Sequence, residues 1–353
     1  MNGATARTDP ARGGAAPRRR LRVLTWHVHG NYLYSLTQTP HDFVVPVLPG
    51  NPPGYAALGP RIPWGPNVRQ VPAEHLHKEP LDCVIYQSRG AFERDRFRLL
   101  TPGQRALPCA YIEHNPPEPH PTDTVHFFRH ERGILVHVTH YNALMWHAPG
   151  VRTRVVEHGI VAPAAALYTG ELARGITVIN NLPQRGRRVG VDLYEWTARR
   201  VPLDLIGMRS EAMGGLGEVP NMEVAATMAK YRFFFTPIRY ASLGLSLVEA
   251  MMAGMPIVGV AATELPNVIT NGVEGYVDSR PDRLLDCMRQ LIHEPELARR
   301  WGLAARKTAL KRFSIERHID DWNEVLAALA EMGREGAGHE CRQGYEPNGA
   351  RHG

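Results

Sequence analysis

Two features in the second half of the chain could handle a phosphate-bearing ligand. Glu249 is a lone carboxylate in a segment otherwise made of Leu, Val, Ala and Met, and three arginines surround a glycine at 185–188. A carboxylate buried without a partner is costly, so Glu249 needs a hydrogen-bond donor. A ribose diol could donate from both of its hydroxyls, and an ion pair with an arginine would be a purely structural solution. The residues alone leave both open.

The segment before this carboxylate predicts a strand, a loop and a helix. Tyr231–Thr236 is an apolar run too short for a helix, and Pro237 stops it, which indicates a buried parallel strand. We expect Ser242 to cap the following helix and Gly244 to let the backbone approach a ligand. The first amides of the helix, including that of Leu245, then form an anion site that the helix dipole supports.

The arginines follow a second predicted strand, residues 175–179. In open α/β sheets, ligands bind outside the carboxyl ends of parallel strands, which is where this loop would lie. Arg185 and Arg188 are therefore candidates for a diphosphate, because a guanidinium can contact phosphate through two parallel hydrogen bonds. The alternative is a solvated basic loop, which is what most runs of like charge are.

Polar side chains also end a strand in the first half. Residues 109–113 form an apolar run that finishes in Glu113, His114 and Asn115, and Pro116 stops it. This places Glu113 and His114 at the carboxyl edge of a parallel sheet, so both are candidate site residues. A structural histidine satisfied by the backbone is the alternative for His114.

Length and pattern predict two α/β domains. The chain has 353 residues, more than one typical domain needs, and short apolar strands alternate with helical segments in both halves. The stretch 40–80 contains ten prolines and is expected to be irregular backbone. Further strands are expected at 21–26, 81–87, 134–139, 154–158 and 203–207. Further helices are expected at 92–100, 141–147, 191–199, 222–230, 281–294, 295–313 and 314–331.

Charge and cysteine content exclude several classes of protein. The formal net charge is +6, but residues 1–20 hold five arginines and one aspartate, so about +2 remains for everything else. A basic nucleic-acid-binding face is therefore not indicated. The four cysteines show no CxxC pairing and no zinc-type spacing. With no apolar run of eighteen residues, we expect a cytoplasmic protein without a transmembrane segment.

The stretch around Glu249 resembles the donor-binding signature of the retaining glycosyltransferases of family 4. The matching features are Glu249-Ala250, Gly254, Pro256-Ile-Val and the pair Gly272 and Gly275. The resemblance implies the GT-B fold, an α/β architecture with two Rossmann-like domains whose parallel sheets face a central cleft. One position departs from the signature, because Ala241 stands where the family usually has its first glutamate.

The resemblance also implies a domain layout. A disordered basic tail is expected at 1–20, an acceptor-side domain at 21–165, a nucleotide-sugar domain at 166–332 and a second disordered tail at 333–353. The last helix is expected to cross back onto the first domain. The implied activity is transfer of a sugar, a hexose or a deoxysugar, from a nucleoside diphosphate sugar with retention of configuration. Neither a metal nor a further cofactor is expected.

The implied roles follow the signature. Glu249 would hold the ribose, while Arg185, Arg188 and the amides after Gly244 would hold the pyrophosphate. Gly30 would be the close-approach residue of the first loop, and His114 would face the reacting sugar with Glu113 beside it.

The acceptor is open: a glycan, a lipid or a small metabolite, with peripheral membrane contact compatible and nucleic acid not expected. Because Ala241 replaces the usual glutamate, the alternative is a non-catalytic nucleotide-sugar-binding paralogue that acts as a partner or regulator. Another GT-B enzyme, such as a nucleotide-sugar epimerase, is the remaining enzymatic alternative.

Overall fold

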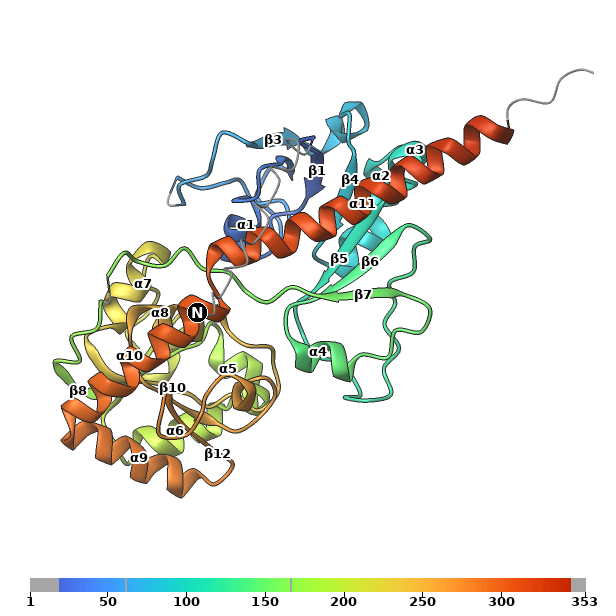
Figure 1. Ribbon diagram of the computed structural model, residues 1–353. Coiled ribbons are helices and arrows are strands. Elements are labelled where there is room, and N and C mark those ends of the chain that lie inside the picture. Colours follow the sequence, from blue (N-terminus) through green and yellow to red (C-terminus); the bar gives the residue numbers. More distant parts are fainter. Residues whose placement is uncertain (1–18, 61, 166, 344–353) are drawn as a thin grey trace, which may run out of the picture.

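The protein is built on two separate parallel sheets, one in each half of the chain (Figure 1). The computed structural model describes residues 19–60, 62–165 and 167–343. The first sheet has the order β3-β2-β1-β4-β5-β6-β7 and the second β12-β11-β10-β8-β9. Every strand pair within both sheets is parallel, as expected for strands joined by helical crossovers.

The first domain contains seven strands: β1 (Arg22–Thr25), β2 (Asp42–Val47), β3 (Val68–Pro72), β4 (Cys83–Tyr86), β5 (Cys109–Glu113), β6 (Gly133–His137) and β7 (Arg152–Val155). Its helices are α1 (Gly30–Leu36), the 3₁₀ turn η1 (Ala73–Lys78), the π-helical η2 (Ala91–Asp95), α2 (Arg96–Leu99), α3 (Pro102–Arg105) and α4 (His140–Met145). The central strands β4, β5 and β6 are buried throughout, because helices and loops cover both faces of the sheet.

The second domain contains five strands: β8 (Leu172–Val178), β9 (Leu203–Ile206), β10 (Tyr231–Thr236), β11 (Ile257–Val260) and β12 (Gly275–Asp278). Its helices are α5 (Leu182–Arg185), α6 (Val191–Ala198), α7 (Asn221–Met228), α8 (Leu245–Ala253), α9 (Pro281–His293) and α10 (Pro295–Arg312), with the short turns η3 (Gly186–Val189), η4 (Ser210–Met213) and η5 (Leu265–Asn267). β10 is buried along its whole length at the centre of this sheet, which confirms the strand predicted before Pro237.

Two strands lie where irregular backbone was expected. β2 and β3 both fall within the proline-rich stretch 40–80, so that expectation is wrong for them. Pro46 even occupies an interior strand, since β2 pairs with both β1 and β3. Proline is normally confined to edge strands, but the neighbouring Phe43 and Val45 are fully buried in the core, and their packing outweighs one lost ladder bond.

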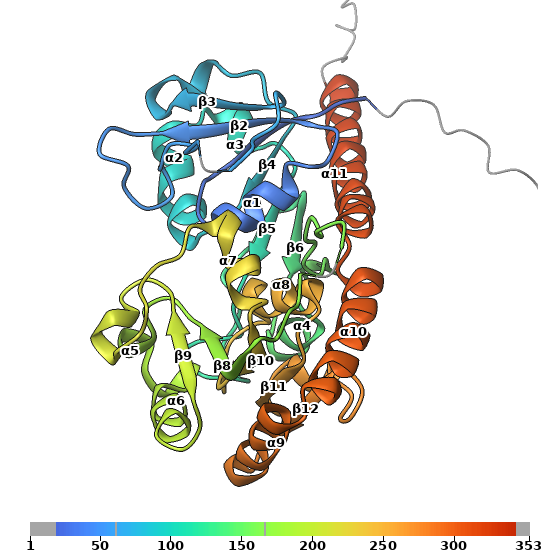
Figure 2. The ribbon, with the colours of Figure 1, turned by 90° about the vertical axis from the view of Figure 1, so that its left-hand side faces the viewer.

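The last helix, α11 (Ile315–Gln343), leaves the second domain and lies along the first (Figure 1, Figure 2). Trp322, Leu326 and Leu329 are almost completely buried in the same core as Val23 of β1. This is the crossing expected from the family resemblance. The helix continues to Gln343, so residues 333–343 are helical rather than part of a disordered tail. The preceding Met332 packs on the first-domain core at the end of a helix that is already formed, and the helix continues from there.

The predicted N-terminal tail is ordered at its last two residues. Arg19 pairs with Asp82 at 2.8 Å, and Arg20 pairs with Asp42 at 2.5 Å. The rest of that predicted tail, residues 1–18, lies outside the described residues, as do residues 344–353.

Candidate active site

A cavity of about 580 Å³ lies between the two domains and is called here the interdomain cavity. The first domain contributes residues 28–31, the loop that leads into α1. The second contributes the carboxyl ends of β8 and β9, the loop after β10 and the start of α8. The cavity thus occupies the place where open parallel sheets bind ligands. Gly30, Arg185, Ser242, Gly244, Leu245 and Glu249 all line it, as does Ala241.

Glu249 faces this cavity from α8. Burial raises the pKa of its carboxyl to about 7, and a hydrogen bond from Asn31 opposes that shift. The bond is long, with 3.4 Å between Asn31 Nδ2 and Glu249 Oε1. None of the described residues forms an ion pair with Glu249, which argues against the structural alternative of a buried arginine partner. Its carboxylate has unused capacity to accept hydrogen bonds from a ligand.

The N-terminus of α8 also opens on the cavity. Gly244 is its N-cap, with φ −72° and ψ 141°, and no side chain caps the helix. The amides of Leu245 and Ser246 have no partner within a helix, because they belong to its first turn. These amides and the helix dipole favour an anion at this point.

Ser242 does not cap α8, so that prediction is wrong. Its hydroxyl donates to the backbone oxygen of His114 at 2.5 Å and accepts from Asn142 Nδ2 at 2.5 Å. Both partners belong to the first domain, so the serine joins the domains instead. A serine just before a helix looks the same in the sequence whether it caps that helix or bonds to another domain. Only the position of the first domain in the structure shows which of the two Ser242 does.

Only one of the three clustered arginines lines the interdomain cavity. Arg185 lies there, and no carboxylate among the described residues is within ion-pair distance of it. Desolvation lowers the pKa of its guanidinium, which stays charged at neutral pH. Arg188 instead pairs with Glu118 of the first domain, and Arg187 pairs with Asp192 at 2.9 Å. Arg188 was predicted to bind the diphosphate together with Arg185, but it does not line the interdomain cavity, because its side chain pairs with Glu118.

Glu113 and His114 lie at the carboxyl end of β5 as predicted, but they face different surroundings. Glu113 accepts from the backbone amide of Asn115 at 2.9 Å and from Nε2 of the buried His126 at 3.1 Å. It lines a second cavity of about 360 Å³ together with Trp146 and Arg188. Glu113 is thus not brought to the interdomain cavity, because its carboxylate turns toward His126.

His114 lies behind the interdomain cavity. Its ring is 4.4 Å from that of His29, which lines the cavity, and 4.9 Å from that of Tyr32, measured between centroids. Burial and the neighbouring His29 and His158 hold its pKa well below the usual range, so the ring is neutral. His114 Nε2 has no hydrogen-bond partner among the described residues.

Two asparagines that the sequence did not single out hold the domains together beside Glu249. Asn31 Nδ2 donates to Asn221 Oδ1 at 2.8 Å, and Asn221 Nδ2 donates back to Asn31 Oδ1 at 2.5 Å. Residues 190 positions apart carry no local pattern that would link them. Asn31 stands in the same loop as Gly30, and that proximity is the one signal that could have identified it.

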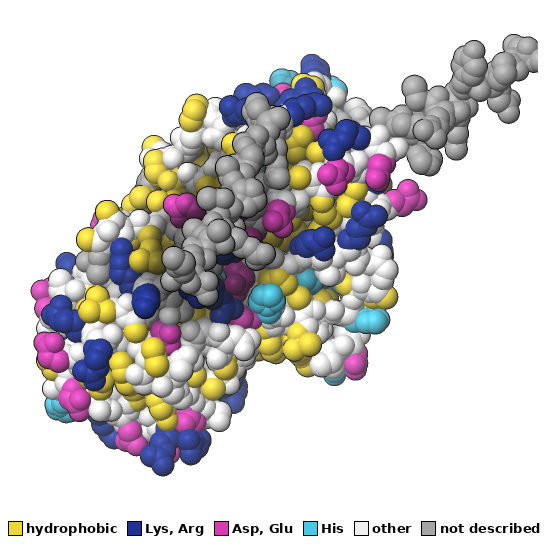
Figure 3. Space-filling model, in the orientation of Figure 1, with side chains coloured by type: hydrophobic (Ala, Val, Ile, Leu, Met, Phe, Trp, Pro, Cys, Tyr) yellow, Lys and Arg dark blue, Asp and Glu magenta, His cyan; other side chains and the backbone are white. Residues whose placement is uncertain are grey.

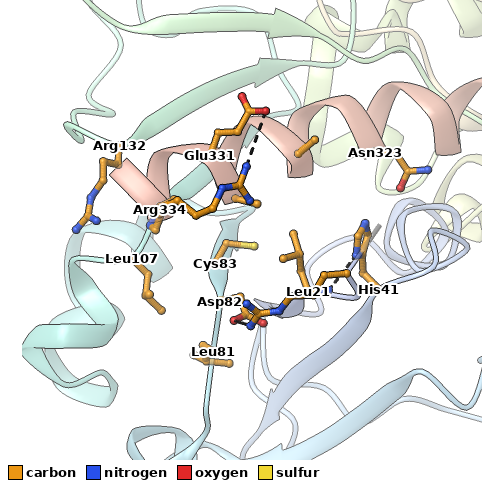
Figure 4. A pocket seen from close by; sticks show the side chains of 15 residues that line it. Leu21, His41, Leu81, Asp82, Cys83, Leu107, Arg132, Asn323, Glu331 and Arg334 are labelled. Carbon is orange, nitrogen blue, oxygen red and sulfur yellow. Dashed lines mark hydrogen bonds and ion pairs between the residues drawn. The ribbon is translucent and has the colours of Figure 1, made fainter. Parts of the chain in front are cut away.

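A further cavity of about 580 Å³ lies at the opposite edge of the first sheet (Figure 4). Its lining comes from the residues that precede β1, β4 and β5 and from α11, with Leu21, Cys83 and Arg334 among them. None of the predicted site residues lines it. It is therefore separate from the candidate active site.

The surface shows mixed charge over the second domain, where Lys and Arg side chains lie among Asp and Glu (Figure 3). This agrees with the small net charge left after subtracting the N-terminal tail. Within residues 19–343, with the two gaps noted above, no helix is both long and apolar enough to span a bilayer.

Comparison with known sequences finds a similarity to glycosyltransferases in the second domain. Residues 211–308 match the family described as Glycosyl transferases group 1. N-acetyl-alpha-D-glucosaminyl L-malate synthase of Bacillus anthracis is 33% identical over 86 residues, which are 24% of this chain and 23% of that protein. The matches to curated relatives span only 20–27% of the length of those proteins.

Solved structures resemble nearly the whole chain. Sucrose-phosphate synthase from Thermosynechococcus elongatus superposes with a TM-score of 0.65 at 15% identity, covering 88% of this chain and 99% of that one. HepE from Anabaena, solved with UDP and glucose, gives a TM-score of 0.60 at 14% identity, covering 88% and 100%. The comparisons confirm the GT-B fold and the predicted resemblance at the level of GT-B glycosyltransferases.

Proposed function

We propose that this chain, with its GT-B fold and group 1 glycosyltransferase segment, transfers a sugar from a nucleoside diphosphate sugar to an acceptor bound between the domains. The observation that carries the proposal is the joint presence of Arg185, the uncapped start of α8 and Glu249 in one cavity. These groups match the two polar parts that every such donor has, a pyrophosphate and a ribose. HepE, a structural neighbour, was solved with UDP.

The charges of the cavity suit departure of a nucleoside diphosphate. As the bond to the sugar breaks, negative charge grows on the leaving phosphate. The first amides of α8 are held by the helix backbone, so they stabilise that charge without reorganising, and Arg185 adds a positive charge in the same cavity. Burial removes water from the Arg185 guanidinium, and this desolvation strengthens its attraction to phosphate.

Glu249 would hold the ribose. Two ribose hydroxyls donating to its carboxylate would replace the weak contact with Asn31 and favour the ionised form. Donor binding near neutral pH is therefore expected to release a fraction of a proton from Glu249, whose pKa in the free protein is about 7.

The remaining details are part of the proposal. His29 and the neutral His114 would meet the transferred sugar, a hexose or deoxysugar, and Ala241 lines the cavity at the position where the family usually has its first glutamate. Retention of configuration and independence of a metal follow from the resemblance to family 4. The acceptor would be a glycan, a lipid or a small metabolite.

A donor panel tests the proposal. Purified protein is incubated with UDP, GDP, ADP and dTDP sugars and with candidate acceptors, and released nucleoside diphosphate is measured. One donor class should react, and Glu249→Ala should abolish the signal, while Glu223→Ala, an exposed carboxylate on α7, should not. If no donor reacts but nucleoside diphosphates still raise the Tm, the protein is the non-catalytic binding paralogue instead.

A further inference from the structure

Tyr32 is buried at the centre of a group of three histidines that come from separate parts of the chain. Its ring is 4.9 Å from His114, 5.8 Å from His158 and 5.7 Å from His318, measured between centroids. Tyr32 is on α1. His114 follows β5, His158 lies in the interdomain connection, and His318 lies on α11. We call these four residues the hinge cluster. Tyr32 and His318 are at most 1% exposed, and His158 is 5% exposed.

The hinge cluster lies where the chain passes between the domains. The chain crosses once after β7 and once at the junction of α10 and α11, and the two crossings touch. The Ile160 amide donates to the Phe313 oxygen at 3.0 Å, and Ile160 and Ser314 form a β-bridge. Gly159 packs so tightly that an added Cβ would lie 2.2 Å from the Cβ of His318. These two crossings join the domains covalently, so a rotation of one domain against the other would change the packing around them.

Two members of the cluster are tied to the loop that begins α8. His158 Nε2 lies 2.9 Å from the backbone oxygen of Leu243. The backbone oxygen of His114 accepts from Ser242 Oγ at 2.5 Å. Because this loop also lines the interdomain cavity, opening that cavity would break both contacts and bring His114 and His158 toward solvent.

His158 and His318 each use one ring nitrogen for a hydrogen bond that protonation would not remove, and the other ring nitrogen has no acceptor among the described residues for an added proton. A carbonyl oxygen can only accept, so His158 donates from Nε2 to Leu243, and His318 donates from Nδ1 to the Glu157 oxygen at 2.8 Å. The opposite nitrogens, His158 Nδ1 and His318 Nε2, have no partner among the described residues. A proton added to either would create a buried charge without an acceptor, which is costly.

The surrounding charges do not compensate such a proton. Arg317 donates to the backbone oxygen of His158 at 2.5 Å and adds positive charge next to it. The carboxylate of Glu157 is already bound by Arg312 at 2.6 Å. Burial is the main cause that lowers the pKa of His158 to about 4 and that of His318 to about 3. The titratable and charged groups that act on the cluster histidines are His29, Glu157 and Arg317, and the last two are paired in turn with Arg312 and Asp321.

We propose that the hinge cluster is a proton-sensitive hinge, in which neutral imidazoles hold the two domains closed over the interdomain cavity and protonation opens them. Tyr32 acts as a positioning residue, because its ring fills the space between the three imidazoles and keeps solvent out. The hinge concerns domain closure in the ligand-free protein, so it does not depend on glycosyl transfer.

The direction of the pH effect follows from the lowered pKa values. If opening returns His158 to solvent, its pKa rises from about 4 toward the ordinary 6.5. The closed state then has its full advantage above pH 6.5 and loses it as the pH falls toward 4. For one imidazole, the ratio of closed to open protein should fall about tenfold at pH 5.5 and approach a hundredfold at pH 4.5.

Protonation of Glu249 has the opposite effect on domain closure from protonation of the histidines. Its pKa is raised, so protonation removes a buried charge and favours closure as the pH falls. The test is therefore made in the Glu249→Gln variant, which lacks this titration. Small-angle scattering of the ligand-free protein measures the radius of gyration from pH 7.5 to 4.5, and circular dichroism at each pH confirms that the protein remains folded.

The informative variant is His158→Gln with His318→Asn in the same chain. Glutamine can donate to the Leu243 oxygen and asparagine to the Glu157 oxygen, so the hydrogen bonds remain while the titration is lost. The matched control is His137→Gln, which removes a buried histidine of β6 whose pKa is also about 4 but whose ring neighbours His126 rather than the members of the hinge cluster. Tyr32→Phe serves as a further variant that removes only the hydroxyl and keeps the ring between the imidazoles.

We expect the parent protein, Tyr32→Phe and His137→Gln to expand reversibly as the pH falls, and the double variant to stay compact. Expansion of the double variant equal to that of the parent would overturn the proposal. A parent protein that keeps one radius of gyration down to pH 4.5 while folded would overturn it as well. A failure of the donor panel would leave this result unaffected, so the two proposals fail separately.

Discussion

Replacing Glu249 by glutamine is expected to stabilise the ligand-free protein at alkaline pH while weakening its hold on a nucleotide donor. The carboxyl of Glu249 is desolvated in the interdomain cavity, and Asn31 offers it only a long hydrogen bond. At pH 8 the group is ionised without adequate compensation. Glutamine has the same shape and no charge, so it removes that cost but accepts ribose hydroxyls less strongly.

The size of the effect follows from the pKa. A rise from 4.5 to about 7 corresponds to about 3 kcal/mol, since one pKa unit is worth about 1.4 kcal/mol. The folded state binds the proton more tightly than the unfolded state does. The contribution is therefore complete below pH 4.5 and is lost as the pH rises through 7. Glu249→Gln should thus match the parent near pH 4.5 and exceed its free energy of unfolding by up to about 3 kcal/mol at pH 8.5.

The assay is urea unfolding followed by tryptophan fluorescence at pH 5, 7 and 8.5, with calorimetry of donor binding on the same samples. Glu223→Gln on α7 is the control, because this carboxylate is exposed and its removal should change neither quantity. A stability difference that does not vary with pH would refute the buried-charge argument. Unchanged donor affinity would refute the ribose role.

Three further changes probe the same architecture. Arg185→Ala should weaken nucleoside diphosphate binding by about 2 kcal/mol in calorimetry, and Arg187→Ala, whose side chain pairs with a carboxylate outside the cavity, should leave it within about 0.5 kcal/mol. Glu264→Gln should lower the free energy of unfolding in urea by about 1–3 kcal/mol, because the neutral side chain loses the ion pair that this fully buried carboxylate forms with Arg312 at 2.8 Å. Gly302→Ala should lower Tm through overpacking worth about 1–3 kcal/mol, since its Cβ would lie 1.9 Å from the Gly254 oxygen.

The fold was predictable where the spacing of apolar residues and a proline at the end of the segment indicate the same boundary. β10 ends at Thr236, where Pro237 marked the limit, and α9 begins at Pro281, as its pattern indicated. The sequence failed where a strong local signal was overridden by packing. Pro46 argued against a strand, yet burial of its neighbours places it inside β2.

The site was predictable within one domain and not between domains. Glu249, Gly244 and Arg185 belong to loops and a helix at one edge of the second sheet, so topology alone brings them together. Ser242 and Arg188 were misplaced because each bonds to the first domain, to His114 and Glu118 respectively. Nothing in local sequence encodes the approach of a surface that is 70 residues away for Arg188 and 128 residues away for Ser242.

The path of α11 has a consequence for how this protein can be divided or recombined. Trp322, Leu326 and Leu329 complete the core of the first domain, although they follow the whole of the second domain in the chain. A fragment that ends after β7 would leave that core open to water and should aggregate when expressed alone. Exchange of first domains between related proteins would succeed only if α11 were exchanged together with them. The first domain is therefore a folding unit made of two segments that are separate in the sequence.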